Sequence, residues 1–274
     1  MKFKYLIIIF CIIIVMIISL TALLPVLLTG PQTVEGVADL RYITLPFLLI
    51  MVLLFAGVNV FFILNYRLFS LLEREDWPAL AYYLENKVYV KRRYTARNIR
   101  LLATSYMLIS DYQSVLKLES KTQLAKPSLI TKNVLIFGSA RILSGVFSEA
   151  AVFFGTQMRK CKADVFQWVR WFYGFSLLLK GSFDIAEPEF ISLALSSDNA
   201  LITGLSAYFL NTSLEKKSKT PEKCREASED GKKRVVTALK NAAGWNKEMQ
   251  RAGTEIHFAI IKKYIDETGK WLFG

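Results

Sequence analysis

Histidine and cysteine are scarce in this chain of 274 residues, which limits the chemistry that it can carry out. There is one histidine, His257, and the three cysteines, Cys11, Cys161 and Cys224, lie far apart. A metal centre needs several such ligands close together, and a disulfide framework needs paired cysteines. We therefore predict no metal and no cofactor, and the isolated thiols suit a reducing compartment.

The short motifs that carry catalysis are also missing. The chain has no phosphate-binding loop, no glycine-rich dinucleotide fingerprint and no Gly-x-Ser-x-Gly, since the segment 204–208 lacks the final glycine. His257 stands beside Phe258 in a helical pattern, and we expect it to pack in the interior. The sequence therefore predicts that the protein is not an enzyme.

Two long apolar runs occupy the first quarter of the chain. Residues 5–28 form 24 positions without a charge, and residues 43–64 form 22 positions in which only Asn59 is strongly polar. At about 1.5 Å per residue, each run is long enough as a helix to cross a hydrocarbon core of roughly 30 Å. We predict a transmembrane hairpin over residues 1–65, in which Asn59 hydrogen-bonds across to the first span.

Lysine and arginine flank the two predicted spans unevenly. Lys2 and Lys4 precede the first span and many basic residues follow the second, whereas the connecting segment 29–42 has only Arg41. Basic segments near the ends of spans resist translocation, so both termini are predicted to be cytoplasmic. A cleavable signal peptide is the alternative for the first run, although that run exceeds the roughly 7 to 15 apolar residues of a signal core.

A short phrase recurs four times after the apolar runs. A small or polar residue and a turn residue precede an aromatic, and the four aromatics stand 35, 35 and 36 positions apart: Trp77, Tyr112, Phe147 and Phe183. Self-similarity at a period of about 34 residues is typical of stacked helical hairpins, because one hairpin cannot bury its own apolar face. Each aromatic is predicted to begin the second helix of a hairpin.

Residues at fixed distances from each aromatic agree with this prediction. A small or apolar residue stands nine positions before it, and residues suited to a helix crossing stand three and seven positions after it, with one acidic exception. Small residues let two helices approach closely, and large ones fill the adjacent holes. The three sets are Leu68, Ala103, Gly138 and Gly174; Leu80, Val115, Ala150 and Ala186; and Leu84, Glu119, Phe154 and Phe190.

This pattern resembles the tetratricopeptide repeat over residues 61–200. The four copies start near Phe61, Ala96, Thr131 and Gln167. The early tryptophan of that family is replaced and its closing proline is present only as Pro127, so a generic solenoid of helical hairpins is the alternative. Either way the expected fold is all-α, with the N-terminal two-helix transmembrane hairpin followed by an α-solenoid of tetratricopeptide-like hairpins.

The first repeat overlaps the second span, so residues from Ile43 to about Glu73 are predicted to form one helix. The next helix would run back and return a group of basic residues toward the membrane, where anionic headgroups attract each by about 1 kcal/mol. This group is Lys87, Lys91, Arg92 and Arg93. A solvated loop that only sets the topology is the alternative. Nucleic-acid binding is not expected, because the aromatics fall at repeat-core positions.

In the family that the chain resembles, protein partners lie along a groove lined by the first helix of each hairpin. The matching positions are basic at one end and aromatic at the other, which suits a peptide with acidic residues and an apolar anchor. They are Arg97, Arg100, Thr104, Lys132, Leu135, Ser139, Trp168, Trp171 and Phe175. The alternative is that helices after Ala200 fold back and cover the three aromatics.

The last part of the chain, residues 201–274, is predicted to form capping helices. Pro221 marks one helix start, and a final helix is expected from about Asn246 to Thr268. The apolar triplet Trp271-Leu272-Phe273 that follows is expected to help close the core, because terminal repeats must hide one end of a solenoid.

The resulting prediction is a membrane-anchored adaptor or scaffold that recruits or organises protein partners, with self-association and contact with anionic lipid as further expectations. The layout resembles HemY-type bacterial membrane proteins, which implies the bacterial inner membrane. Two other classes remain open: a structural subunit of a large envelope assembly, such as a secretion apparatus or a flagellar motor collar, and an accessory subunit of a membrane enzyme or transporter.

Overall fold

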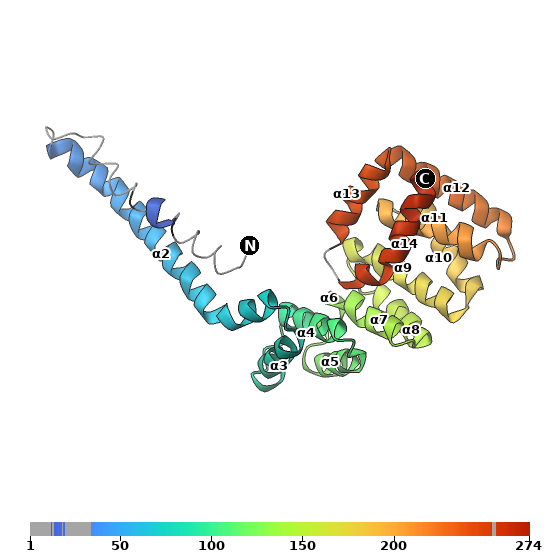
Figure 1. Cartoon of the computed structure of the whole chain (residues 1–274), viewed down its shortest axis with the longest axis horizontal. Helices are drawn as coiled ribbons and strands as arrows, with labels where there is room; N and C mark the ends of the chain where they lie inside the picture. Colours follow the sequence, from blue (N-terminus) through green and yellow to red (C-terminus); the bar gives the residue numbers. More distant parts are fainter. Residues whose placement is uncertain (1–11, 13, 18, 20–33, 254–255) are drawn as a thin grey trace. The chain divides into compact units, whose positions relative to one another are not determined.

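A computed structural model of the protein describes residues 12, 14–17, 19, 34–253 and 256–274 (Figure 1). Every regular element in these residues is a helix, so the predicted all-α class is confirmed. The chain divides into two compact units, residues 1–83 and residues 84–274. Residues 201–274 thus belong to the same unit as the hairpins that precede them.

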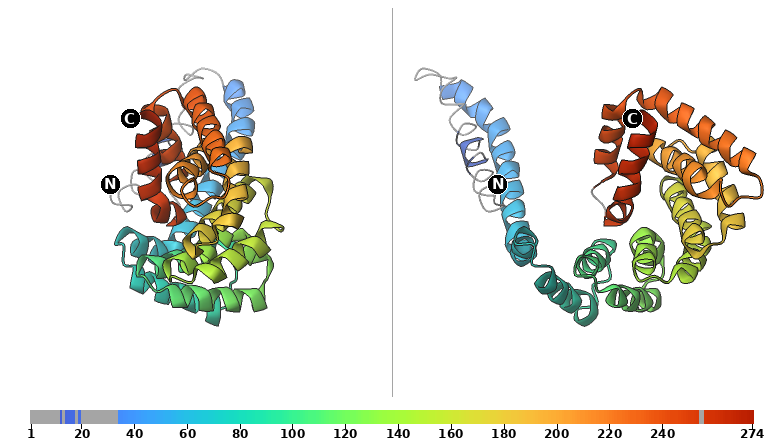
Figure 2. Two further views of the ribbon diagram at one scale, coloured as in Figure 1. Left: turned by 90° about the vertical axis from the view of Figure 1, so that its right-hand side faces the viewer. Right: turned by 45° about the vertical axis from the view of Figure 1, so that its right-hand side comes forward.

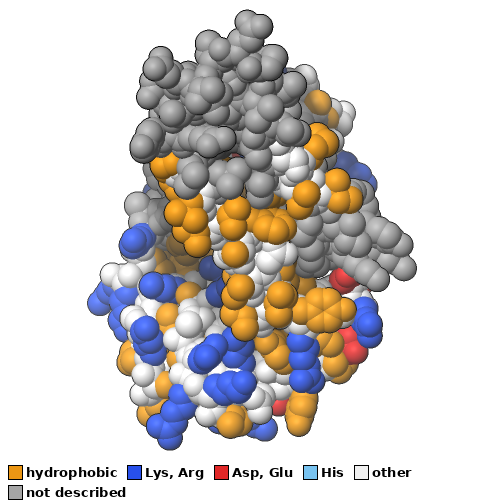
Figure 3. All heavy atoms as spheres, turned by 90° about the vertical axis from the view of Figure 1, so that its left-hand side faces the viewer, with side chains coloured by type: hydrophobic (Ala, Val, Ile, Leu, Met, Phe, Trp, Pro, Cys, Tyr) orange, Lys and Arg blue, Asp and Glu red, His pale blue; other side chains and the backbone are white. Residues whose placement is uncertain are grey.

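The first unit is dominated by α2 (Val34–Glu73), a single helix of 40 residues. Its part Leu49–Glu73 is long and apolar enough to cross a membrane and is not buried within the structure. Figure 3 shows hydrophobic side chains gathered along this helix. The predicted continuous helix from Ile43 to Glu73 is therefore present. Most of the predicted first span, residues 5–28, lies outside the described residues.

Two predictions for this region need correction or restriction. The connecting segment was expected to reach residue 42, but the helix already begins at Val34; the strongest turn residues, Gly30 and Pro31, precede it. Asn59 donates a hydrogen bond from Nδ2 to the carbonyl of Phe55 at 2.8 Å, within its own helix. This bond satisfies part of a polar side chain in an apolar stretch.

The second unit is a succession of antiparallel helical hairpins. The two helices of each hairpin contact each other, and the second helix contacts the first helix of the next hairpin, an order compatible with an α-solenoid. The pairs are α4 (Ala96–Leu108) with α5 (Tyr112–Ala125), α7 (Val134–Leu143) with α8 (Phe147–Met158), α9 (Ala163–Lys180) with α10 (Phe183–Ser196), and α11 (Ala200–Phe209) with α12 (Pro221–Leu239).

Shorter elements and two final helices complete the described chain. α14 contacts both α7 and α11, and Figure 2 shows it on the inner side of the curve that the hairpins follow. The expected single final helix is in fact two helices. These elements are α3 (Trp77–Glu85), the π-helical turns η2 (Asn86–Val90) and η3 (Leu210–Leu214), α6 (Ser128–Lys132), α13 (Ala242–Ala252) and α14 (Ile256–Phe273).

The recurring phrase of the sequence corresponds to one recurring turn. Its four aromatics are the first residues of α3, α5, α8 and α10, as predicted. In the second copy, the N–H of Asp111 donates to the carbonyl of Tyr106 at 2.9 Å and that of Ser110 to Met107 at 3.1 Å, which is the Schellman helix end. The residue two before each aromatic has a positive φ of 53° to 85°: Glu75, Ser110, Gly145 and Gly181.

Close helix crossings explain the residues at fixed distances from these turns. A Cβ atom built on Gly138 would lie 2.0 Å from Cζ of Phe154, whose side chain is fully buried, so any larger residue at this position would force a shift in the crossing of α7 and α8. Glu119, the acidic exception, accepts a hydrogen bond at 3.1 Å from Arg141 Nη2. The guanidinium also lies 4.4 Å from the centre of the Phe153 ring, and this ion pair takes the place of an apolar contact.

Candidate functional site

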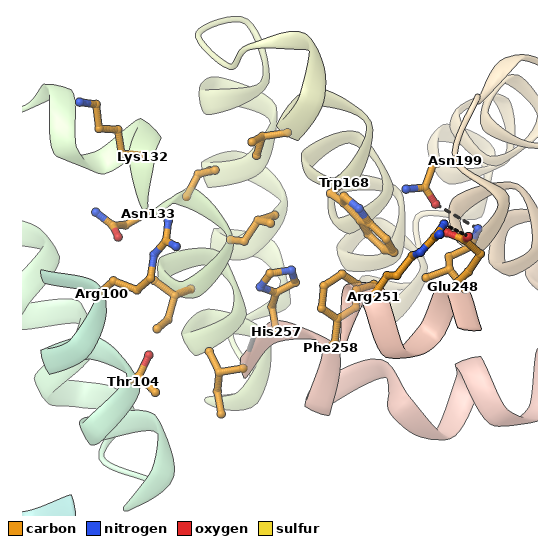
Figure 4. Close-up of a pocket in the computed structure, with 17 residues that line it drawn as sticks. Arg100, Thr104, Lys132, Asn133, Trp168, Asn199, Glu248, Arg251, His257 and Phe258 are labelled. Atoms are coloured by element: carbon orange, nitrogen blue, oxygen red, sulfur yellow. Dashed lines mark hydrogen bonds and ion pairs between the residues drawn. The ribbon is translucent and has the colours of Figure 1, made fainter. Parts of the chain in front are cut away.

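The second unit contains a pocket of about 520 Å³, within the range of roughly 300 to 1,000 Å³ that is typical of ligand sites. Figure 4 shows the lining residues around this space: Arg100 and Thr104 from α4, Lys132 at the end of α6, Trp168 from α9 and residues of α13 and α14. Five of the nine predicted groove residues line the pocket: Arg100, Thr104, Lys132, Leu135 and Trp168.

The other four predicted groove residues do not line the pocket. Arg97 is exposed on α4, whereas Ser139, Trp171 and Phe175 are buried, so the prediction that these three lie in an open groove is wrong. The reason is that the C-terminal helices fold back and cover the three aromatics, since Trp168 too is only 9% exposed and meets Phe258 of α14. The ring of Phe175 lies 5.6 Å from that of Phe209 in α11 and 5.6 Å from that of Tyr264 in α14.

One side of the pocket is basic. Arg100 and Lys132 are both exposed lining residues, and they flank the point where α7 begins. Glu248 is an acidic lining residue, and it already accepts a hydrogen bond from Arg251 at 2.7 Å on the same helix. Among the lining residues that the structure describes, three side chains are basic and one is acidic, which favours an anionic ligand.

The opposite side of the pocket is apolar and aromatic. The Trp168 and Phe258 rings meet edge to face with centroids 4.8 Å apart, and both residues line the space. Val165 and Leu201 add aliphatic surface. A ligand that combines a negative charge with an apolar group would therefore meet a complementary surface in each half.

His257 lines the pocket between these two halves (Figure 4). Its side chain is 3% exposed, and its ring lies 4.3 Å from that of Phe258 and 6.0 Å from that of Phe172, so it packs in the interior as expected. Burial and then the positive charge of Arg100 lower the pKa of His257 to about 4. The imidazole is therefore neutral near pH 7 and adds no charge to the pocket.

Two asparagines that line the pocket differ in how many of their side-chain polar atoms are hydrogen-bonded. Asn199 caps α11, because its Oδ1 accepts from the N–H groups of Leu201 and Ile202 at 3.0 and 3.2 Å. Asn133 is only 4% exposed and donates from Nδ2 to the carbonyl of Leu129 at 2.9 Å. Its Oδ1 has no hydrogen-bond partner among the described residues.

The four residues predicted to contact lipid lie together at η2 and the turn after it, and Arg97 joins them. Lys91, Arg92 and Arg93 are exposed. Burial lowers the pKa of Lys87, and the charges of Arg93, Arg97 and Lys91 lower it further, so these side chains repel one another. We call Lys87, Lys91, Arg92, Arg93 and Arg97 the basic cluster; an anionic surface would relieve its repulsion.

Sequence reasoning missed Asn133, His257, Glu248 and Arg251 as pocket residues. The last three come from the C-terminal helices, more than 100 positions from Asn133 along the chain. Within the described ranges, no group of three or more His, Cys, Asp or Glu side chains is placed to hold a metal ion.

Fold and pocket together define an all-helical protein that has, among the described residues, one long unburied apolar helix and a hairpin unit that carries a charged and aromatic pocket. Residues 114–274 match the model of a family described as "Uncharacterised Treponema protein". The chain is 30% identical over 264 residues to an uncharacterized protein of Treponema pallidum (strain Nichols), an alignment that covers 92% of this chain and 80% of the relative. The chain therefore belongs to this family of uncharacterised Treponema proteins. No solved structure matches it.

Proposed function

We propose that this protein is a membrane-anchored helical-repeat adaptor that recruits or organises a protein partner at the membrane. The observation that carries the proposal is the pocket of the hairpin unit, in which Arg100 and Lys132 line one side and Trp168 the other side of a space of about 520 Å³ (Figure 4). Helical-hairpin arrays present extended inner surfaces that are used mainly for binding. Arginine and tryptophan are also among the residues that contribute most to interface energies.

The unburied apolar stretch Leu49–Glu73 supports the membrane part of the proposal. Contiguous apolar surface of this extent is rare on proteins that are surrounded by water, and lipid is the simplest cover for it. In the proposed topology, two spans form a hairpin in the bacterial inner membrane with both termini in the cytoplasm. The excess of lysine and arginine on both flanks of the pair of runs supports this orientation.

The basic cluster supports a second contact with the membrane. Exposed Lys91, Arg92 and Arg93 lie on one turn beside Arg97, and each basic residue near an anionic surface contributes about 1 kcal/mol of attraction. In the proposed arrangement this turn touches anionic headgroups while the pocket remains available to the protein partner. Vesicle co-sedimentation of the intact protein against a variant with these residues changed to glutamine tests the lipid contact.

Crosslinking pull-down from native membranes tests the proposed function. The intact protein is compared with a variant carrying Lys132→Glu and Trp168→Ala and with a control carrying Lys117→Glu, an exposed position on α5 that does not line the pocket. Loss of one dominant protein from the pocket variant alone is expected. An unchanged set of captured proteins, with the intact protein and both variants equally helical and equally inserted, contradicts recruitment through this pocket.

Two other classes give different results in the same membranes. A structural subunit of an envelope assembly forms side-to-side oligomers of the protein in mild detergent. An accessory subunit of a membrane enzyme or transporter keeps its partner through the spans, so co-purification survives deletion of residues 77–274. A partner that is lost with the pocket variant separates the adaptor from both.

A further inference from the structure

The helix α7 begins inside the pocket and lacks a side-chain cap. Its N-cap residue is Asn133, which makes no side-chain hydrogen bond to the first turn. Val134, Leu135 and Ile136 form this turn and all three line the pocket. The first N–H groups of a helix have no partner within the helix and carry a partial positive charge, so such an end favours an anion.

Asn133 provides an independent sign of a ligand at the same place. The residue is 4% exposed and lines the pocket, and its amide nitrogen already donates to the carbonyl of Leu129. Its buried Oδ1 has no partner among the described residues. Buried polar atoms are nearly always hydrogen-bonded in folded proteins, so this oxygen points to a bound group that donates a hydrogen.

The side chains around the start of α7 add positive charge. Arg100 and Lys132 lie beside Asn133 on one side of the pocket (Figure 4). Glu248, the acidic side chain among the described lining residues, is on α13 and is paired with Arg251. Hydrogen bonds in which the donor and acceptor are both charged are shorter and stronger than neutral ones, so the two exposed basic side chains can hold an oxyanion in front of α7.

We propose that Arg100, Lys132, Asn133 and the first turn of α7 form an oxyanion subsite that takes a carboxylate from an acidic segment of a partner protein. This inference rests on the proposed function, because the partner supplies the segment. The basic side chains and the α7 amides bind the carboxylate, and a neighbouring backbone N–H of the segment donates to Asn133 Oδ1. An adjacent apolar side chain of the segment packs on Trp168 and Phe258.

The aromatic half of the pocket favours a peptide carboxylate over a bare inorganic ion. A free phosphate would bind at Arg100 and Lys132 but leave uncovered Leu135 and the small exposed parts of Trp168 and Phe258, which are 9% and 8% exposed. An acidic residue next to an aromatic residue covers both halves and brings the N–H donor that Asn133 lacks. The matched chemistry is therefore an acidic and an apolar side chain in consecutive positions of an extended segment.

Fluorescence anisotropy tests the subsite on the intact protein in detergent micelles. The probe is a labelled pool of short acetylated peptides in which a Glu-Asp pair precedes phenylalanine, and the control pool carries Gln-Asn in place of that pair. We expect the acidic pool to bind more tightly, and Lys132→Glu to weaken it on the order of tenfold or more. Lys117→Glu, which makes the same charge change outside the pocket, is expected to leave binding unchanged.

Asn133→Asp is a second variant, for which we expect unchanged or higher thermal stability together with weaker peptide binding. Aspartate is a favoured N-cap residue and carries its own carboxylate into the site. We expect the variant to unfold at the same temperature as the parent or higher, and to lose affinity for the acidic pool on the order of tenfold. Undiminished binding by a folded Asn133→Asp protein overturns the subsite.

The remaining outcomes separate the subsite from the proposed function. Equal binding of the acidic and control pools, or equal effects of Lys132→Glu and Lys117→Glu, overturns the subsite. If inorganic phosphate displaces a bound dye from the pocket while neither peptide pool binds, the ligand is a free anion and the peptide assignment is wrong. Partner loss with Trp168→Ala but not with Lys132→Glu in native membranes overturns the subsite alone and leaves the adaptor function standing.

Discussion

Replacing Gly138 with alanine is expected to destabilise the hairpin unit, although alanine is the better helix former. The new Cβ would lie 2.0 Å from Cζ and 2.4 Å from Cε1 of Phe154. The Phe154 ring cannot move aside freely, because it is fully buried and stacked on Phe172 with centroids 5.6 Å apart. Overpacking of this kind costs about 1 to 3 kcal/mol, against a gain of about 1 kcal/mol in helix propensity.

The net loss is therefore up to about 2 kcal/mol in the free energy of unfolding. For a unit of this size each kcal/mol shifts the melting temperature by roughly 2 to 4 °C, so Gly138→Ala is expected to lower it by up to about 8 °C. Thermal unfolding of the intact protein in detergent, followed by far-UV circular dichroism, measures the shift.

Gly174 supplies a matched control, because it occupies the same position in the next hairpin. A Cβ at Gly174 would lie 3.4 Å from the ring of Phe190, which is ordinary van der Waals contact. Gly174→Ala is therefore expected to be neutral or to stabilise by up to about 1 kcal/mol. If Gly138→Ala is as stable as Gly174→Ala, the close crossing of α7 and α8 is wrong.

Three further predictions concern His257, a buried ion pair and a strained turn. The pKa of His257 is lowered to about 4 in the folded chain, so between about pH 6.5 and pH 4 protons bind the unfolded chain preferentially. The free energy of unfolding should therefore decrease by up to about 3 kcal/mol as the pH falls through this window. His257→Phe should remove this pH dependence, which denaturant titrations at several pH values measure. Glu119→Leu leaves the half-buried Arg141 guanidinium without its carboxylate and should lower the free energy of unfolding, measured in urea, by about 1 to 3 kcal/mol. Adding Arg141→Met should restore part of this loss; equal stability of Glu119→Leu and the double variant would refute this. Ser110 has a positive φ of 59°, so Ser110→Gly should stabilise the protein by about 0.5 to 1 kcal/mol and raise its melting temperature. Gly181 has φ 85° in the equivalent turn, so Gly181→Ala should lower the melting temperature.

Local features of the fold were predictable from the sequence. The conformation of a turn depends on a few adjacent residues, which is why Tyr112 and Phe183 correctly marked the starts of α5 and α10. Close crossings are similarly local, since Gly138 and Phe154 lie in one hairpin. The extent of α2 was predicted at its C-terminal end but not at its start, because Gly36 and the charged residues Glu35, Asp39 and Arg41 are typical of a loop but lie in the first turns of the helix.

Only part of the candidate site could be predicted, because the rest depends on helices that are far away along the chain. Arg100, Lys132 and Trp168 follow from the repeat positions, since each stands on the first helix of a hairpin or immediately before it. The burial of Trp171 depends on helices that follow much later in the chain, and no local pattern states where those helices return. Asn133 was not predicted, because it stands out only by its buried Oδ1, which has no hydrogen-bond partner among the described residues, and the sequence does not show this.

Site-specific photocrosslinking in native membranes tests the central claim most directly. A photoreactive amino acid is placed at Leu135, which lines the pocket, and in a matched protein at Val152, which is 71% exposed on α8 and does not line it. The account predicts one dominant protein adduct from position 135 and none of that species from position 152. The same adducts from both positions, or none from position 135 in a folded and inserted protein, would contradict the pocket as the partner site.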